Sequence, residues 1–139
     1  MIERIDYMCI FCKIINNEIP CYKIYENNHV LAFLDISPAT LGHTLVIPKK
    51  HYEHILDLDD EIAEEIMKAV VNVTKILHNK LNVVDFNLEN NNGVLAGQEV
   101  KHYHIHVIPR YKKRTLVPSG TDCNPTKEDI LTIHQKIIA

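Results

Sequence analysis

The chain lacks several features that mark large classes of proteins. Its 15 Lys and Arg residues stand against 18 Asp and Glu residues, so the formal net charge is −3. No global basic field gathers phosphate backbones, and binding to nucleic acid through bulk charge is disfavoured. No apolar run approaches the roughly 20 residues that span a bilayer, and the run Val30–Leu34 stops at Asp35. We therefore expect neither nucleic acid nor membrane as a partner.

The chain also lacks the marks of a secreted disulfide protein. It has four cysteines and no positively charged, apolar, cleavable leader. Such a pattern favours a reducing compartment over a disulfide framework, and we expect a cytoplasmic protein. Tryptophan is absent and only 6% of the residues are aromatic, yet there are nine histidines. This excess of histidine is where function is to be sought.

The length and the hydrophobic pattern predict one α+β domain. The chain has 139 residues, 46% of them hydrophobic, which suits a single core over residues 1–139. Apolar residues recur at three and four positions from Asp59 to Leu81 and predict one long amphipathic helix that covers one sheet face. Strands of a mostly antiparallel, about five-stranded sheet are expected at 21–26, 29–35, 43–47, 85–89 and 100–108. Shorter helices are expected at 9–15 and, in the tail 111–139, at 126–138.

Three histidines stand two residues apart in the last expected strand. Successive side chains of a strand point to opposite faces, so His102, His104 and His106 share one face, roughly 6 to 7 Å apart. The residues between them, Tyr103, Ile105 and Val107, are then expected to pack under the long helix. The row has three interpretations: a solvated strand face, a metal site, or nucleophilic catalysis by one imidazole.

The loop before this strand supplies groups that suit phosphorus chemistry. An imidazole that attacks phosphorus forms a phosphoramidate, which is labile enough to be hydrolysed in a second step. Gly93 and Gly97 allow backbone amides to approach an anion, and the side chains of Asn91 and Gln98 can bond phosphate or leaving-group oxygens. The same glycines also suit a simple turn between strands.

Cys9 and Cys12 have the C-x-x-C spacing that two tetrahedral metal ligands use. From the pair alone, redox chemistry and plain buried thiols remain alternatives. Cys21 and Cys123 have no partner at a useful spacing and are interpreted as ordinary thiols. The single histidines at positions 29, 43, 78 and 134 are interpreted as structural or surface residues.

The chain resembles the histidine triad (HIT) superfamily, in particular its Hint-like branch. The hallmark His-φ-His-φ-His-φ-φ is matched at residues 102–108. Four blocks in matching order extend the resemblance over roughly Cys9 to Arg110: CIFCKII at 9–15, LDISP at 34–38, HTLVIPKKH at 43–51 and GQEV at 97–100. The resemblance implies the HIT fold, with a domain core at residues 9–110.

It also implies a nucleotide hydrolase or transferase that acts at the α-phosphate of a purine nucleotide, such as an AMP phosphoramidate or a dinucleoside polyphosphate. His104 would be the nucleophile, oriented by His102, and His106 would contact the phosphate or the leaving group. Asn91 and Gln98 would hold phosphate oxygens. The ribose would bind Asp35, which otherwise caps a turn, and apolar side chains that are otherwise core would sandwich the base: Ile10, Phe11, Ile14, Phe33 and Ile36.

For members with this cysteine pair the resemblance implies a structural zinc on Cys9, Cys12, His51 and His102, with His54 as a competing ligand. It further implies a homodimer formed through the long helix and adjoining sheet edges. The tryptophan-containing C-terminal stretch of eukaryotic Hint proteins is replaced by a basic cluster at residues 110–114 and the expected tail helix. The leaving-group side is therefore not carried over, and a zinc-stabilised nucleotide-binding protein with little turnover is the alternative function.

Overall fold

A five-stranded antiparallel sheet forms the centre of the protein. The structure is a computed structural model that describes residues 8–112 and 125–139. The strands are β1 Lys23–Glu26, β2 Val30–Leu34, β3 Thr44–Pro48, β4 Asp85–Glu89 and β5 Ile105–Arg110, in the order β1-β2-β3-β5-β4. The helices are α1 Ile10–Ile15, α2 Asp60–Leu81 and α3 Lys127–Ile138. The predicted α+β class is confirmed.

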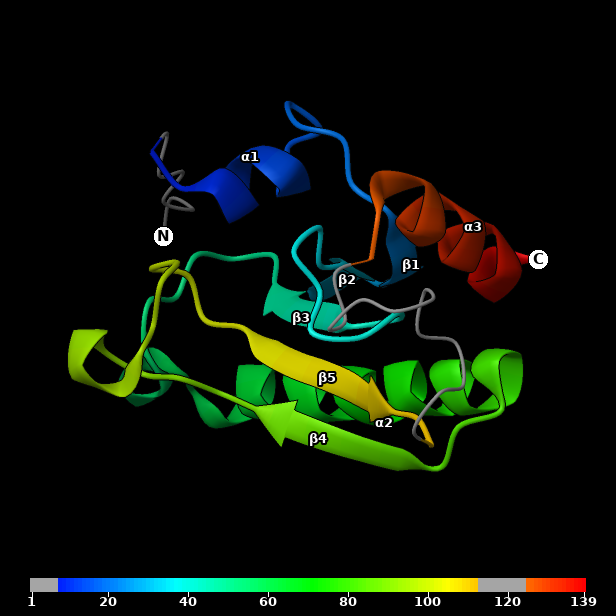
Figure 1. The fold of residues 1–139 in the computed structure, drawn as a ribbon. Helices are drawn as coiled ribbons and strands as arrows, with labels where there is room; N and C mark the ends of the chain where they lie inside the picture. The colour runs from blue at the N-terminus through cyan, green and yellow to red at the C-terminus, as the bar shows by residue number, and fades with distance from the viewer. Residues whose placement is uncertain (1–7, 113–124) are drawn as a thin grey trace.

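Helices cover both faces of the sheet (Figure 1). The long helix α2 lies along one face and the short α1 lies over the other. Alternation along β2 sends Val30, Ala32 and Leu34 into the cluster that contains α2, whereas Leu31 and Phe33 pack with α1. All five residues of β2 are buried for this reason. The α1 face carries the histidines, so the site lies on the side that α2 does not cover.

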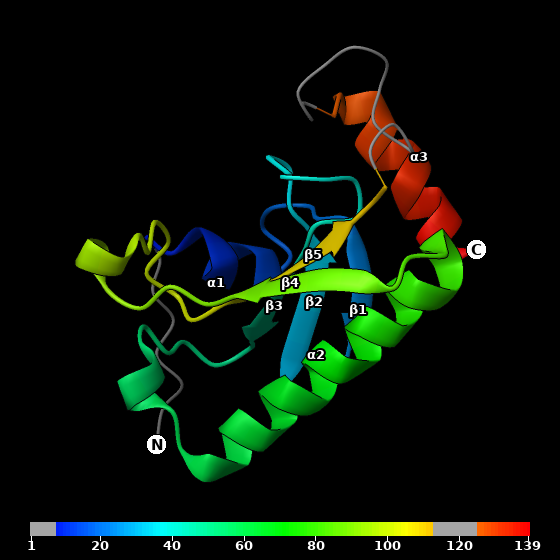
Figure 2. The same ribbon diagram turned by 60° about the horizontal axis from the view of Figure 1, so that its bottom comes forward.

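Side chains just before α2 and α3 cap the first turns of these helices. Asp59 caps α2 by accepting a hydrogen bond from the Ile62 backbone nitrogen at 2.9 Å. Thr126 and Asp129 form a reciprocal capping box at the start of α3. The tail helix joins the main core, because its buried Ile130, Ile133 and Ile137 pack in the cluster that contains α2. Figure 2 shows α3 against the C-terminal end of α2.

The last strand begins later than its sequence pattern predicts. β5 starts at Ile105, not at Val100, so His102 and His104 precede the strand. The backbone nitrogen of Tyr103 donates to the Tyr52 carbonyl at 2.6 Å, so this segment bonds to the loop after β3 and not to a strand. The predicted alternation still holds, since Tyr103, Ile105 and Val107 pack in the α2 cluster. No helix in residues 8–112 and 125–139 is long and apolar enough to cross a membrane.

Candidate functional site

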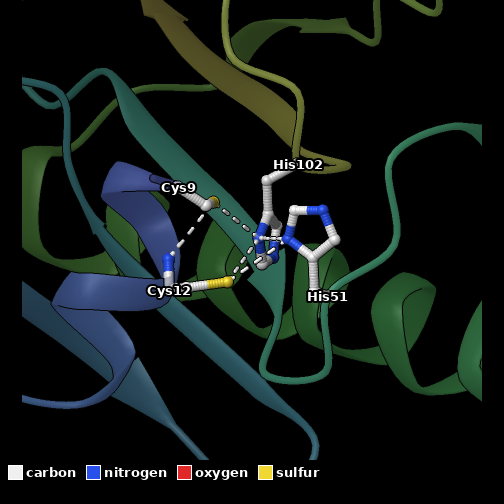
Figure 3. A group of neighbouring side chains, drawn as sticks. All are labelled: Cys9, Cys12, His51 and His102. Carbon is white, nitrogen blue, oxygen red and sulfur yellow. Dashed lines mark hydrogen bonds between the residues drawn. The ribbon is translucent and has the colours of Figure 1, made fainter. Parts of the chain in front are cut away.

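Four side chains from distant parts of the sequence meet beside α1 (Figure 3). Cys9 is the N-cap of α1 and Cys12 lies one turn later, while His51 follows β3 and His102 precedes β5. Both cysteines and His102 are buried and His51 is half-buried. Each offers one ligand atom, and these four atoms lie within 4.8 Å of one another.

The spacing of these atoms suits a tetrahedral ion. The Sγ of Cys9 lies 3.4 Å from Nδ1 of His102, and the Sγ of Cys12 lies 3.2 Å from Nδ1 of His51 and 3.7 Å from Nδ1 of His102. The two Nδ1 atoms are 3.1 Å apart. With bonds of about 2.3 Å to sulfur and 2.0 Å to nitrogen, tetrahedral zinc separates its ligand atoms by roughly 3.3 to 3.8 Å. The cluster is close to that arrangement.

The tautomer of His102 also fits a metal ligand. Its Nε2 lies 2.8 Å from the Pro48 carbonyl oxygen. A carbonyl only accepts, so Nε2 carries the hydrogen and Nδ1 presents its lone pair to the two sulfurs. Metal-bound histidines commonly bond a carbonyl through their second nitrogen in this way. Cys9, Cys12, His51 and His102 could therefore hold zinc in a closed site, which supplies structure and no open position for substrate.

A pocket of about 500 Å³ lies next to this cluster and changes character across the sheet. Its apolar wall comes from α1, β2 and the loop after β2. Asp35 lies where β2 ends, and His43 lies where β3 begins. Glu89, at the end of β4, lines the far side. The expected site residues that line it are Ile10, Phe11, Ile14, Phe33, Asp35, Ile36, Asn91, His104 and His106. An apolar wall, a carboxylate and a histidine pair thus follow one another across one pocket.

His104 is held as a neutral imidazole whose second ring nitrogen keeps a free lone pair. Its Nδ1 lies 2.6 Å from the backbone carbonyl of His102, so Nδ1 donates and Nε2 keeps a lone pair. The ring is only 6% exposed and packs edge-on against Phe11, with centroids 5.2 Å apart. Burial lowers the pKa of His104 below its usual value. A neutral, oriented imidazole is a nucleophile at neutral pH.

His43 is a site residue that the sequence analysis did not find. Its Nδ1 accepts from the Ala39 backbone nitrogen at 2.9 Å, so its Nε2 carries the hydrogen and donates to Nδ1 of His106, also at 2.9 Å. His106 then carries its own hydrogen on Nε2. Burial lowers the pKa of His43 to about 4, which keeps His43 neutral at neutral pH. The pair sets His106 as a donor.

Asp35, His43 and His106 also place ligand-type atoms within 4.8 Å of one another. The hydrogen bonds do not favour a metal there. Nε2 of His43, which lies 3.6 Å from Oδ2 of Asp35, carries the hydrogen and has no lone pair for an ion. His43 and His106 form a hydrogen-bonded pair with the Asp35 carboxylate beside it, in contrast to the four-residue cluster.

Comparison with known proteins places the chain in a family. Residues 16–113 match the HIT domain family. The chain belongs to the HIT family. It is 52% identical over 105 residues to Protein hit of Bacillus subtilis, covering 76% of this chain and 72% of that protein. It is 45% identical over 130 residues to adenosine 5′-monophosphoramidase hnt1 of Schizosaccharomyces pombe, covering 93% and 95%.

The fold is that of known HIT structures. A Zn-bound histidine triad family protein from Mycobacterium smegmatis superposes with a TM-score of 0.77 at 32% identity, covering 94% of this chain and 93% of that one. Its zinc is a property of that protein. For the present HIT protein, a metal site is supported by the distances between the four ligand atoms and by the tautomer of His102.

Gln98 is the expected site residue that this HIT structure does not bring to the pocket. Its Oε1 accepts from the Gly93 backbone nitrogen at 2.8 Å, and its Nε2 donates to the carbonyls of Glu53 at 2.7 Å and Val100 at 3.1 Å. The amide is buried and hydrogen-bonded to backbone groups of neighbouring loops, and Gln98 does not line the pocket. The structure therefore corrects its predicted role in binding phosphate: it shapes the loop that carries Asn91.

His54, Arg110 and Lys112 lie outside both the cysteine cluster and the pocket lining. His54 caps the short 3-10 helix Ile55–Asp57, where its Nδ1 accepts from the Leu56 backbone nitrogen at 3.1 Å, and it is not in the cysteine cluster. In the basic cluster at residues 110–114, Arg110, which ends β5, and Lys112 do not line the pocket. Lys113 and Arg114 lie outside the described residues, as does Cys123.

Proposed function

We propose that this HIT protein hydrolyses a purine nucleoside 5′-phosphoramidate, or transfers its nucleotidyl group, through a covalent bond to His104. The supporting observation is the 2.6 Å bond from His104 Nδ1 to the His102 carbonyl, which leaves the Nε2 lone pair of a pocket residue ready to attack. The phosphoramidase name of a relative 45% identical over 93% of the chain supports the same substrate class.

The pocket provides a place for each part of such a substrate. The apolar side chains of α1 and β2 form a slot for the base, with Phe11 and Phe33 meeting edge to face at 5.7 Å. Asp35 follows beside it for the ribose hydroxyls. Its Oδ1 accepts from the Ser37 backbone nitrogen at 2.8 Å, which fixes the carboxylate. Asn91 and His106 lie beyond it, where the α-phosphate would sit.

The reaction would proceed in two displacements. His104 Nε2 attacks the α-phosphorus, the bond from phosphorus to the amine nitrogen breaks with its electron pair, and that nitrogen takes a proton, for which the Nε2–H of His106 is the donor. A water then attacks the same phosphorus and returns a proton to His106, the bond to His104 breaks with its electron pair staying on Nε2, and the nucleoside monophosphate leaves. Zinc, when bound, would supply structure by fixing His102, whose carbonyl holds His104.

The test is turnover of an adenosine 5′-phosphoramidate by the purified protein. The wild-type protein is expected to release AMP, and His104→Ala is expected to lose at least about 10³-fold in kcat, since a covalent nucleophile is removed. His29→Asn, a change at an exposed histidine outside the pocket, is the matched control and should keep wild-type activity. Tight nucleotide binding without product would instead support the alternative, a nucleotide-binding protein stabilised by zinc.

Two further parts of the proposal concern the state of the protein. We propose a homodimer that joins α2 faces and β4 edges: Met67 and Val71 are exposed on α2, and β4 is an edge strand with exposed Leu88. Light scattering at twice the monomer mass supports this arrangement, and a monomer contradicts it.

We also propose the cytoplasm as the compartment, since Cys9, Cys12 and Cys21 form no disulfide. Cell fractionation tests that assignment.

A further inference from the structure

The phosphate end of the pocket has an unusual charge for a site that acts on phosphate esters or amides. Three carboxylates line the pocket as a whole, those of Asp35, Glu89 and Glu99. No lysine or arginine lies in the lining among residues 8–112 and 125–139. A site that accepts a polyphosphate commonly offers fixed cations to the added charge. This pocket offers imidazole side chains and carboxylates instead.

Glu89 lies directly beside the histidines. It pairs with His106 in the antiparallel register of β4 and β5, so the two side chains share a face of the sheet. Such opposite residues have Cβ atoms roughly 5 Å apart. The carboxylate of Glu89 therefore stands on the β4 side of His106, away from the apolar wall on α1 and β2.

Glu99 approaches from the loop. It follows Gly97 and Gln98, and the bonds of the Gln98 amide to Glu53 and Val100 fix this part of the chain. Glu99 lines the pocket and acts electrostatically on His104. Since Asp35 belongs to the ribose side, Glu89 and Glu99 are the two charges at the end where a group leaving the α-phosphorus would depart.

Two basic side chains, one just after β3 and one at the end of β5, have partners outside the pocket lining. Lys49 pairs with Glu26 at 2.7 Å, and Arg110 donates through Nε to Asn87 Oδ1 at 2.7 Å. Neither Lys49 nor Arg110 lines the pocket. Within the described residues, the field of Glu89 and Glu99 at the leaving-group end is therefore not neutralised by a cation in the lining.

We propose that Glu89 and Glu99 select leaving groups that carry a positive charge, so that the preferred substrate is a nucleoside phosphoramidate of a diamine or another amine with a remote ammonium group. This inference rests on the proposed function and names its substrate more closely. The phosphorus-to-nitrogen bond breaks as in the neutral case, and the remote ammonium is unchanged. A dinucleoside polyphosphate, whose leaving group is a nucleotide anion, is repelled by the same two carboxylates.

The test compares three adenosine 5′-phosphoramidates, those of 1,4-diaminobutane, n-butylamine and 4-aminobutanoate, which differ chiefly in the charge at the far end. For the wild-type protein, kcat/KM should fall in that order, with the cationic substrate favoured over the anionic one by at least about tenfold. Both carboxylates are exposed, so this ratio should shrink as salt is raised from about 0.02 M to about 0.5 M.

The paired variant Glu89→Gln/Glu99→Gln should bring the ratio to within about twofold. Glu64→Gln/Glu128→Gln removes the same charge from exposed positions outside the pocket and should keep the wild-type ratio. A wild-type ratio near one, or a ratio that the paired variant leaves unchanged, overturns this inference alone. Failure to cleave any of the three substrates overturns the proposed function and this inference with it.

Discussion

His102 and His104 are joined by one bond that links the two clusters of the site. Nδ1 of His104 donates to the backbone carbonyl of His102 at 2.6 Å, while the ring of His102 points to the cysteines. The residue that faces the metal-type cluster therefore also fixes the tautomer of the ring in the pocket. Substitutions in the cluster of Cys9, Cys12, His51 and His102 should therefore also affect the orientation of the His104 ring.

The first prediction concerns metal content. The purified protein is expected to carry one zinc per chain, and Cys9→Ser/Cys12→Ser should lose it, because two of four ligands are removed. The variant should also lose several kcal/mol of unfolding free energy, since binding of a structural metal is coupled to folding. Elemental analysis and urea unfolding measure both effects.

Cys21→Ser is the control for this prediction. Cys21 is half-buried in the pocket wall and lies outside the cluster, so its substitution should leave the zinc content unchanged. Zinc retained by the double variant would contradict the four-ligand site and would favour metal binding by the three histidines of the triad.

The second prediction concerns acid stability. Burial lowers the pKa of His43 to about 4 from 6.5. The unfolded chain takes up this proton as the pH falls below 6.5 whereas the folded protein does not, so His43 makes the protein less stable between pH 6.5 and 4. By pH 5 the loss from this group is at most about 2 kcal/mol.

Urea unfolding at pH 7.5 and pH 5 measures this slope. The drop in unfolding free energy should be smaller for His43→Gln than for the wild-type protein, while His29→Gln, at an exposed position, should follow the wild type. Protonation of the cysteine cluster acts on all three proteins alike. Equal drops in all three would show that His43 is not held neutral.

The third prediction tests the base slot at its most exposed member. Ile36 is 72% exposed yet lines the pocket, so Ile36→Ser should cost the free protein less than about 0.5 kcal/mol. If the base covers this side chain, KM should rise about three- to tenfold. Leu56→Ser, at an 86% exposed position outside the pocket, should change neither value. An unchanged KM in Ile36→Ser would remove Ile36 from the slot.

The sequence predicts the helices well because their signals are local. The three- and four-residue period of α2, the Asp59 cap and the capping box at Thr126 each lie within a few residues of the element they define. The alternation around Tyr103 is local too, and it holds even though the segment before Ile105 is not a strand. The strand start depends on Tyr52, 51 positions earlier, to which Tyr103 bonds.

The roles of Gln98 and His43 depend on contacts that no spacing reveals. The Gln98 amide donates to the Glu53 carbonyl and so does not face the pocket, and His43 is hydrogen-bonded to His106, 63 positions away. The one signal for His43 in the sequence is its place at the head of the block HTLVIPKKH. The residue types therefore indicate which acids and bases lie near the site, but they do not predict which ring nitrogen of each histidine carries the hydrogen.

The fourth prediction concerns the tail. Ile133 is 6% exposed and packs with α2, so Ile133→Ala should destabilise the protein by about 2 to 4 kcal/mol. Leu131 on the same helix is 45% exposed, and Leu131→Ala should change stability by less than about 0.5 kcal/mol. Thermal and urea unfolding of the two variants compare these values directly. Equal stability of both would mean that α3 does not pack on the core.

The covalent step is the central claim, and intact-mass spectrometry of the protein mixed rapidly with an adenosine 5′-phosphoramidate tests it most directly. A nucleotidyl adduct should appear during turnover, map to His104 after digestion, and vanish in His104→Asn, while His29→Asn, at an exposed position outside the pocket, should keep the adduct. Turnover without an adduct, or an adduct on another residue, would contradict the account.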